Sequence, residues 1–466
     1  MKITIIGAGP GGYETAVAAA ARGIEVTIIS DGPVGGTCLN EGCIPTKSLC
    51  RNAEVLEDLR RAEEFGIGNA SWTFDFAKAV ERKNAVIDQL EGGVEFLLKN
   101  KLIRLVYGKA DFKDAGTVTV TPADGGEAED IASDYIIIAT GSVSASLPIP
   151  GADLEGVITS KEILSLDKVP ERLCVIGAGV IGLEFASIFK SFGSEVSVVE
   201  YCKDILPRFD TDLAKRLKQT LGKRGISIET AAAVQSIEKD GDVLKVKYLK
   251  KDKEYEVEAD KVLMAVGRRP NVKAMNLDAA GLEWSPKGIV TDSDMRTNVP
   301  TIFAIGDVRG GMMLAHVATF EGYRALNAII ADNGTPGSAH GVVDGINLDI
   351  VPAAVFTYPE AATVGLTEDD CKNAGIPVRC LKSFFRSNGK ALSMGEPEGF
   401  CKIVVAAEGA ENPGRILGCH MFGAHSSDII QEIAALMNTG ADIDKFKTII
   451  HAHPTLTEVL QSAAHS

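Results

Sequence analysis

The sequence predicts an α/β protein, with two βαβ-type folds that carry β-meander insertions and a separate α+β domain toward the C-terminus. Three observations support this fold class. The order strand, Gly-rich turn, helix, strand occurs twice, alternating strand-like segments lie between and after the two copies, and no Gly-rich turn of this kind follows residue 341. A length of 466 residues fits about three domains at roughly 150 residues each.

The first copy begins the chain with a strand, a turn, a helix and a strand, at residues 3–6, 7–12, 13–22 and 25–29. In the turn, Gly7 permits a tight bend, Gly9 lets the backbone approach a pyrophosphate, and Gly12 lets the helix pack closely. Because the turn follows a strand, we expect a Rossmann-like dinucleotide site here. Ser30 lies 23 residues after Gly7 and Asp31 follows it, so the ribose ligand is Ser30, Asp31 or neither.

The second copy repeats this order at residues 173–176, 177–182, 183–192 and 195–200. Gly177, Gly179 and Gly182 take the same three roles. Glu200 ends the second strand, where a carboxylate can accept hydrogen bonds from an adenosine ribose. No arginine follows within the next four residues to bind a 2'-phosphate, so Glu200 favours NAD over NADP. The alternative is a solvated glutamate at a strand end.

Other segments alternate in the manner of antiparallel strands. Residues 243–249 and 255–258 lie beside charged turns, and we interpret them as a meander inserted in the second fold. Beyond residue 341, apolar strands and helices are expected at residues 402–405, 416–419, 429–437 and 455–463. These segments predict the separate C-terminal domain.

Charge and composition narrow the possible partners. With 63 acidic and 48 basic residues the formal charge is −15, which gives no support to nucleic-acid binding. We find no apolar stretch of 18 residues and no export signal, so we expect no membrane span and a cytoplasmic location. The nine cysteines do not form a disulfide scaffold, and most should be buried free thiols.

One cysteine pair differs from the rest. Cys38 and Cys43 lie five residues apart, directly after the first βαβ unit. A metal site would need two further ligands nearby, and none is present, so we predict no metal. Two ordinary buried thiols are the alternative. Reversible dithiol–disulfide chemistry fits the position beside a cofactor loop better.

Residues 35–47 resemble the signature Gly-Gly-Thr-Cys-x4-Cys-Ile-Pro-x-Lys of the pyridine nucleotide-disulfide oxidoreductase family. Three later motifs of that family follow in their usual order, at residues 139–141, 265–271 and 302–307. They contain the candidate cofactor residues Thr140, Gly141, Gly267, Gly306 and Asp307. The resemblance covers essentially the whole chain.

The resemblance implies that the first fold binds FAD and the second binds NAD. It also implies that Asp307 contacts the ribityl chain of the flavin, and that Lys47 lies near the flavin and pairs with Glu184. A purely structural ion pair is the alternative for those two residues. The implied FAD-binding domain consists of two parts, residues 1–145 and 271–340. The NAD-binding domain lies between them at residues 146–270, and residues 341–466 form a C-terminal dimerisation domain.

Residues 451–458 resemble the signature of the lipoamide branch of the family. Thiols near their ordinary pKa of about 8.5 are mostly protonated at neutral pH, so disulfide exchange needs a base. We assign that role to His453, with Glu458 orienting its other ring nitrogen, and consider His451 the weaker candidate. Thr455 and Glu458 also fit a helix capping box, which is a structural alternative that does not exclude catalysis.

The resemblance thus implies a flavoenzyme that oxidises protein-bound dihydrolipoamide through a Cys38–Cys43 disulfide and reduces NAD. The implied partner is a lipoyl-bearing carrier protein of a 2-oxo acid dehydrogenase or glycine cleavage complex. The family also implies a homodimer in which the His–Glu pair serves the partner's flavin site. The alternatives are another NADH-dependent disulfide reductase, acting on glutathione disulfide or mercuric ion, and a non-catalytic flavoprotein subunit.

Overall fold

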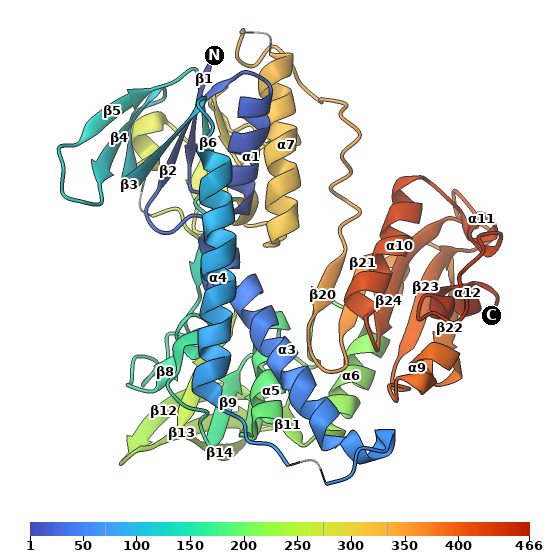
Figure 1. The fold of residues 1–466 in the computed structure, drawn as a ribbon. Helices are drawn as coiled ribbons and strands as arrows, with labels where there is room; N and C mark the ends of the chain where they lie inside the picture. Colours follow the sequence, from blue (N-terminus) through green and yellow to red (C-terminus); the bar gives the residue numbers. More distant parts are fainter. Residues whose placement is uncertain (70, 274, 333) are drawn as a thin grey trace. The chain divides into compact units, whose positions relative to one another are not determined.

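The computed structural model describes residues 1–69, 71–273, 275–332 and 334–466 (Figure 1). The chain divides into two compact units. The first contains residues 1–48, 78–145 and 268–348, and the second contains residues 49–77, 146–267 and 349–466. The four-part domain division expected from the sequence stays a prediction.

The first unit is built on a seven-stranded sheet in the order β19-β6-β1-β2-β3-β4-β5. The first five of these pair in parallel, and β4 and β5 continue from β3 as an antiparallel meander. The bounds are β1 Lys2–Ile6, β2 Glu25–Ser30, β3 Ile103–Asp114, β4 Thr117–Pro122, β5 Glu129–Ala132, β6 Tyr135–Ile138 and β19 Ile302–Ala304. Strand β6 is buried at all four residues, as expected for a strand covered on both faces.

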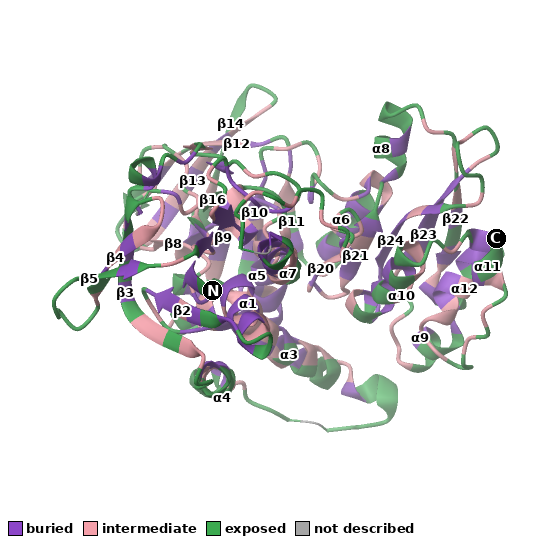
Figure 2. Cartoon of the chain, turned by 90° about the horizontal axis from the view of Figure 1, so that it is seen from above, coloured by how far each residue is buried: buried purple, intermediate pink, exposed green. Residues whose placement is uncertain are grey.

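Helices α1 (Pro10–Ala21) and α7 (Ala315–Ala331) pack closely together in this unit (Figure 1). Glycines permit the approach: a Cβ on Gly322 would lie 1.9 Å from Thr15 Oγ1, and one on Gly11 would lie 2.9 Å from the Ala318 oxygen. The other helices that begin or end in this unit are α2 Gly36–Glu41, α3 Cys43–Arg60 and α4 Phe76–Leu98. Most residues of α4 are exposed (Figure 2).

The second unit contains the other parallel sheet, in the order β11-β10-β9-β15-β8. Its strands are β8 Val157–Ile158, β9 Arg172–Ile176, β10 Glu195–Val199, β11 Ile226–Glu229 and β15 Lys261–Met264, and its helices are α5 Val180–Phe192 and α6 Thr211–Lys223. An antiparallel meander of β12 Ala233–Asp240, β13 Val243–Lys250 and β14 Lys253–Ala259 precedes β15 in the chain. Both predicted βαβ units and the inserted meander are therefore confirmed.

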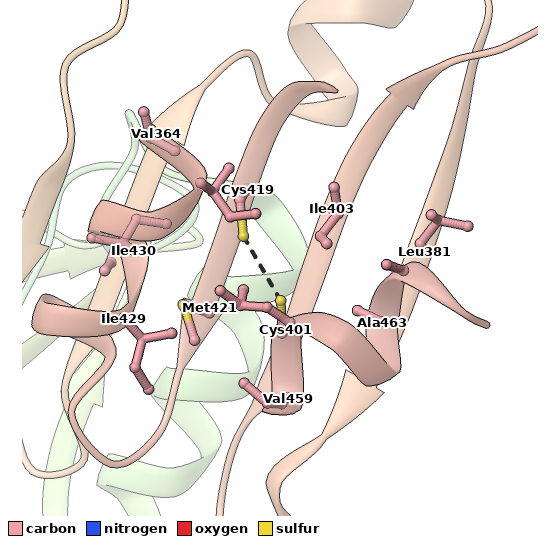
Figure 3. Packing of buried hydrophobic residues seen from close by; sticks show 14 of the residues in the cluster. Val364, Leu381, Cys401, Ile403, Cys419, Met421, Ile429, Ile430, Val459 and Ala463 are labelled. Carbon is pink, nitrogen blue, oxygen red and sulfur yellow. Dashed lines mark hydrogen bonds between the residues drawn. The ribbon is translucent and has the colours of Figure 1, made fainter. Parts of the chain in front are cut away.

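The C-terminal part of the second unit is a five-stranded antiparallel sheet in the order β20-β21-β24-β23-β22. Its strands are β20 Ala353–Val355, β21 Ala361–Gly365, β22 Val378–Phe384, β23 Phe400–Ala406 and β24 Ile416–Phe422. Its helices are α8 Glu368–Asn373, α9 Gly389–Ser393, α10 Ser426–Asn438, α11 Ile443–Lys447 and α12 Glu458–Ala464. Side chains from α10, α12 and the sheet form one apolar core, in which the Cys401 and Cys419 sulfurs lie 3.7 Å apart (Figure 3).

The last predicted helix begins later than expected. The sequence predicted residues 455–463, but α12 begins at Glu458. Thr455 does not cap it in the expected way, because its hydroxyl donates to the Ala452 carbonyl. Only half of the capping box forms: Thr455 N–H donates to Glu458 Oε2 at 2.8 Å, and a tighter turn through Leu456 and Thr457 leads into the helix.

Candidate active site

Both Gly-rich turns have the geometry of a phosphate-binding loop. Gly7 and Gly177 have φ values of 109° and 105°, and an added Cβ would lie 2.3 and 2.4 Å from the carbonyl oxygens of Ala139 and Ala265. A Cβ on Gly12 would lie 1.9 Å from the oxygen of Gly7, which is why the helix can start so close to the turn.

The middle glycines are different. A Cβ on Gly9 or Gly179 would meet no described atom within 4 Å. The fold itself therefore does not require glycine at these two positions. The open space beside them lies where a pyrophosphate approaches the helix N-terminus. A Cβ on Gly182 repeats the close contact of the first loop, 2.0 Å from the oxygen of Gly177. Both loops fit a dinucleotide.

Glu200 follows β10 and is buried, with 7% of its surface exposed. Its Oε2 accepts a hydrogen bond from Ala178 N–H at 2.5 Å, and its Oε1 accepts one from Cys202 N–H at 2.6 Å. The solvated-glutamate alternative is therefore wrong. Each carboxylate oxygen keeps acceptor capacity for a ribose hydroxyl, because an ionised carboxylate has about four acceptor sites.

At the corresponding end of β2, Ser30 is buried and Asp31 is exposed. The Ser30 hydroxyl donates to the carbonyl oxygen of Gly32 at 2.8 Å. That hydrogen bond uses the only proton of the Ser30 hydroxyl and none of its acceptor lone pairs, so Ser30 and Asp31 can both accept a hydrogen bond from a ribose and the choice between them stays open.

Cys38 lies in the short helix α2, and Cys43 is the first residue of the next helix, α3. Both are free thiols and partly buried. The Cys38 pKa is raised, chiefly by its hydrogen bond to Cys43 and by burial, while Lys47 acts in the opposite direction. The two sulfur groups therefore lie within hydrogen-bonding reach of each other, which is the proximity that disulfide formation requires.

Asp307 belongs to a polar network that sequence reasoning identified only in part. Ser142 Oγ donates to Asp307 Oδ2 at 2.5 Å, and Arg268 Nε donates to Ser142 Oγ at 2.7 Å. Ser142 directly follows Gly141 and Arg268 directly follows Gly267, so their positions beside two predicted motifs were the available signal. Burial lowers the Arg268 pKa, and the charges of Asp307, Glu41 and Cys43 act against it.

The same motifs are joined by further contacts. Thr140 Oγ1 donates to the Asn271 carbonyl at 3.1 Å, and Asn271 N–H donates to the Gly141 carbonyl at 3.0 Å. Gly306 N–H donates to Glu321 Oε2 at 2.6 Å, and Glu321 also pairs with Arg309. Glu321 was missed because nothing in the sequence distinguishes it from other helix glutamates. It fixes the turn that presents Asp307.

His453 and Glu458 form the predicted pair. His453 Nδ1 lies 2.9 Å from Glu458 Oε1, and the imidazole is exposed, with 78% of the side-chain surface accessible. The Glu458 pKa is lowered by the Thr455 backbone hydrogen bond and by His453, so the carboxylate is ionised at neutral pH. Glu458 therefore both orients the His453 imidazole and accepts a backbone hydrogen bond at the start of α12.

His451 is occupied elsewhere, as expected for the weaker candidate. Its Nε2 lies 2.8 Å from Glu432 Oε1 and its Nδ1 lies 3.1 Å from the carbonyl oxygen of Ile449, while only 4% of the side chain is exposed. Both ring nitrogens face acceptors, so His451 has no nitrogen available to take a substrate proton.

Two predicted pairings join residues of different compact units. Glu184 is buried in α5, where its Oε1 accepts the Phe356 N–H at 2.9 Å, while Lys47 belongs to the first unit. Likewise, Cys38 and Cys43 belong to the first unit and His453 to the second. The Lys47–Glu184 pair and the meeting of dithiol and base stay predictions.

Across the described ranges, no cluster of three or more His, Cys, Asp or Glu side chains could hold a metal ion. None of the helices in those ranges is long and apolar enough to cross a membrane.

Comparison with known proteins gives two family matches. Residues 1–322 match the family described as pyridine nucleotide-disulphide oxidoreductase, and residues 351–464 match the dimerisation domain of that family. Together they cover most of the chain.

Several relatives are similar over the full length. The chain is 39% identical to a dihydrolipoyl dehydrogenase of Geobacillus stearothermophilus over 99% of this chain and 94% of the relative. It is 37% identical to one of Bacillus subtilis, over 99% and 98%. Among solved structures, the flavoprotein disulfide reductase RclA of Escherichia coli superposes with a TM-score of 0.85 at 28% identity, over 100% of this chain and 99% of RclA.

Proposed function

This chain belongs to the pyridine nucleotide-disulphide oxidoreductase family, and from that membership we propose that it is an FAD- and NAD-dependent dihydrolipoamide dehydrogenase. The observation that carries the proposal is the 2.9 Å contact of His453 with Glu458 at an exposed position, which supplies an oriented base for thiol chemistry. The full-length relatives named dihydrolipoyl dehydrogenase indicate the substrate.

The proposed exchange begins when His453 takes the proton of one substrate thiol. The resulting thiolate attacks Cys38 of the Cys38–Cys43 disulfide, and the S–S bond breaks with Cys43 leaving as a thiolate. The second substrate thiol then attacks the substrate sulfur of the mixed disulfide, and the bond to Cys38 breaks. Cys38 leaves with the proton of that thiol, so lipoamide is released and the enzyme is left reduced, with Cys43 a thiolate and the first proton on His453. Glu458 stabilises the imidazolium that forms on His453.

The cofactor residues follow from the two loops. Gly7, Gly9 and Gly12 would hold the pyrophosphate of FAD, Ser30 or Asp31 its adenosine ribose, and Asp307, Thr140 and Gly141 would lie along its flavin half. Gly177, Gly179, Gly182 and Glu200 would hold NAD. When bound, FAD would supply a two-electron acceptor for the reduced cysteine pair and a hydride donor for NAD. The role of this chain is to position both cofactors and to keep Cys43 toward the flavin.

A homodimer with shared sites fits the exposed base. In the single chain, the His453 side chain is largely exposed to solvent. A catalytic base works best in a site that excludes water, so a second subunit that covers His453 would improve the site. The chain has a dimerisation domain at residues 351–464 that contains this residue. We propose that His453 and Glu458 of one subunit complete the site formed by Cys38 and Cys43 of the other.

The proposed partner is a lipoyl-bearing carrier protein of a 2-oxo acid dehydrogenase or glycine cleavage complex. The nine free cysteines suit a reducing compartment, and we propose a cytoplasmic location on that basis.

A second candidate function is the reduction of another disulfide, which the likeness to the disulfide reductase RclA favours. Steady-state assays of NADH oxidation with lipoamide, glutathione disulfide and mercuric ion separate the two. We expect lipoamide to be strongly preferred. Preference for either of the others would overturn the substrate, and bound FAD without turnover on any of them would indicate a non-catalytic flavoprotein.

A further inference from the structure

Lys402 is a buried cation with three carboxylate partners. It lies on β23, and only 1% of its side chain is exposed. Its Nζ lies 2.6 Å from Asp210 Oδ2, 3.2 Å from Asp212 Oδ2 and 3.1 Å from Glu368 Oε2. An ammonium group has three N–H donors, so each can be directed at one carboxylate. Asp210 is equally buried, whereas Asp212 and Glu368 are largely exposed, at 41% and 49%.

Asp210 ends a segment that begins at the coenzyme residue Glu200. It is the N-cap of α6, and its Oδ1 accepts hydrogen bonds from Asp212 N–H and Leu213 N–H. The other carboxylate oxygen is left for Lys402. The ion pair therefore joins strand β23 of the C-terminal sheet to the start of α6.

The segment of residues 201–210 is also held before its end, by the Ala231 N–H, which donates to the Cys202 carbonyl at 2.8 Å, and by the burial of Ile205 and Leu206. At its start Glu200 accepts the Cys202 N–H, and in its middle Leu206 N–H donates to the Ala178 carbonyl at 3.0 Å. Leu206 has a φ of 47°, a left-handed conformation that is unfavourable for a leucine and must be held by its surroundings. Residues 202–207 also line a half-open hollow, so one side of the segment faces solvent and not packed protein.

Ala178 connects this segment to the phosphate-binding loop through both of its backbone polar groups. Its N–H donates to Glu200, and its carbonyl accepts from Leu206. A shift of the segment would therefore move the loop that carries Gly177 and Gly179 and would change the position of the Glu200 carboxylate.

We propose that Lys402 is a positioning residue for NAD: by holding Asp210 it fixes the far end of the 201–210 segment and keeps Glu200 and Ala178 in their binding geometry. The proposal rests on the coenzyme site assigned under the proposed function. It means that the C-terminal sheet contributes to coenzyme affinity without touching the coenzyme.

The test is a double variant, Asp210→Asn with Lys402→Met. A single Lys402→Met change would leave Asp210 buried and unpaired, which is strongly destabilising in itself. The double variant removes the two buried charges together. Asp212 keeps Lys382, Glu368 is exposed enough to be solvated when it loses Lys402, and Asn keeps the N-cap hydrogen bonds. Lys382→Met is the matched control, because Lys382 lies on the adjacent strand β22 and pairs with Asp212 at 2.8 Å but does not contact Asp210.

We expect the double variant of the holoenzyme to raise the KM for NADH about tenfold, with kcat changed less than about threefold. Anaerobic reduction of its flavin by dihydrolipoamide should proceed at the wild-type rate, because that step does not involve NAD. Lys382→Met should leave the KM for NADH within about twofold of wild type. A merely structural role for Lys402 would instead lower the melting temperature and affect both half-reactions.

A folded double variant with a wild-type KM for NADH overturns the proposal, as does an equal loss in both half-reactions. Glu200→Ala is measured alongside it. If this variant also leaves NADH binding unchanged, the assigned coenzyme site is wrong. If Glu200→Ala weakens NADH and the double variant does not, only the role of Lys402 is refuted.

Discussion

The Oε2 atom of Glu200 accepts a hydrogen bond from Ala178 N–H at 2.5 Å, so the residue that should select the coenzyme is tied to the loop that should bind its pyrophosphate. The carboxylate is oriented before the coenzyme arrives, and binding need not order it.

Coenzyme choice should follow from this carboxylate. Its negative charge repels a 2'-phosphate and accepts hydrogen bonds from a free 2'-hydroxyl, so kcat/KM should favour NADH over NADPH by about a hundredfold or more. Steady-state assays with both coenzymes measure the ratio. Comparable efficiency with NADPH in the unmodified protein would contradict the assignment.

Gly9 should be required for FAD and not for folding. A methyl group there meets no described atom within 4 Å, so Gly9→Ala should fold, yet it would occupy the space of the pyrophosphate. We expect a stable protein with a much lower FAD content, read from the flavin absorbance per chain. Gly12→Ala is the contrast, because its Cβ would lie 1.9 Å from the Gly7 oxygen and should impair folding itself. Full FAD content in Gly9→Ala would show that the pyrophosphate lies elsewhere.

Glu458→Gln should lower kcat for dihydrolipoamide about a hundredfold, because a neutral amide cannot stabilise the imidazolium of His453. The amide oxygen can still accept the Thr455 N–H, so the melting temperature should change little. Since the Glu458 pKa lies below its ordinary value of 4.5, the wild-type carboxylate is ionised throughout the working range. The ratio of wild-type to variant kcat should therefore be constant from about pH 6 to about pH 8. A ratio that disappears toward pH 8 would show that the carboxylate acts differently.

Complementation tests the shared site. Cys38→Ser loses the attacked sulfur and His453→Ala loses the base, so each homodimer should be severely impaired. In a heterodimer of the two, one of the two sites combines an intact Cys38 with an intact His453 if sites are shared. Random co-assembly should then recover about a quarter of wild-type activity. Verified heterodimers without any recovery would show that each site is built within one chain.

Much of this protein could be predicted from local sequence, because the relevant signals are local. The two Gly-rich turns occur where a strand must bend sharply into a helix, and only glycine tolerates the φ of Gly7 and the approach of Gly12 to its oxygen. The Cys38–Cys43 spacing and the proximity of His453 to Glu458 likewise follow from a few neighbouring residues.

Tertiary structure decided what depends on residues far apart in the chain. Glu200 could have been a solvated side chain, and only the return of the Ala178 loop over the strand end buries it. Ser142 forms hydrogen bonds with Asp307 and with Arg268, although 165 and 126 residues separate it from them in sequence. Nothing in the sequence distinguishes Lys402 from a surface lysine. Only the structure shows that β23 places its ammonium group against Asp210. Sequence patterns indicate backbone conformation and periodic burial. The partners of a buried charge depend instead on how distant segments pack. A charge removed from water must be paired, and the fold determines which opposite charge lies close enough.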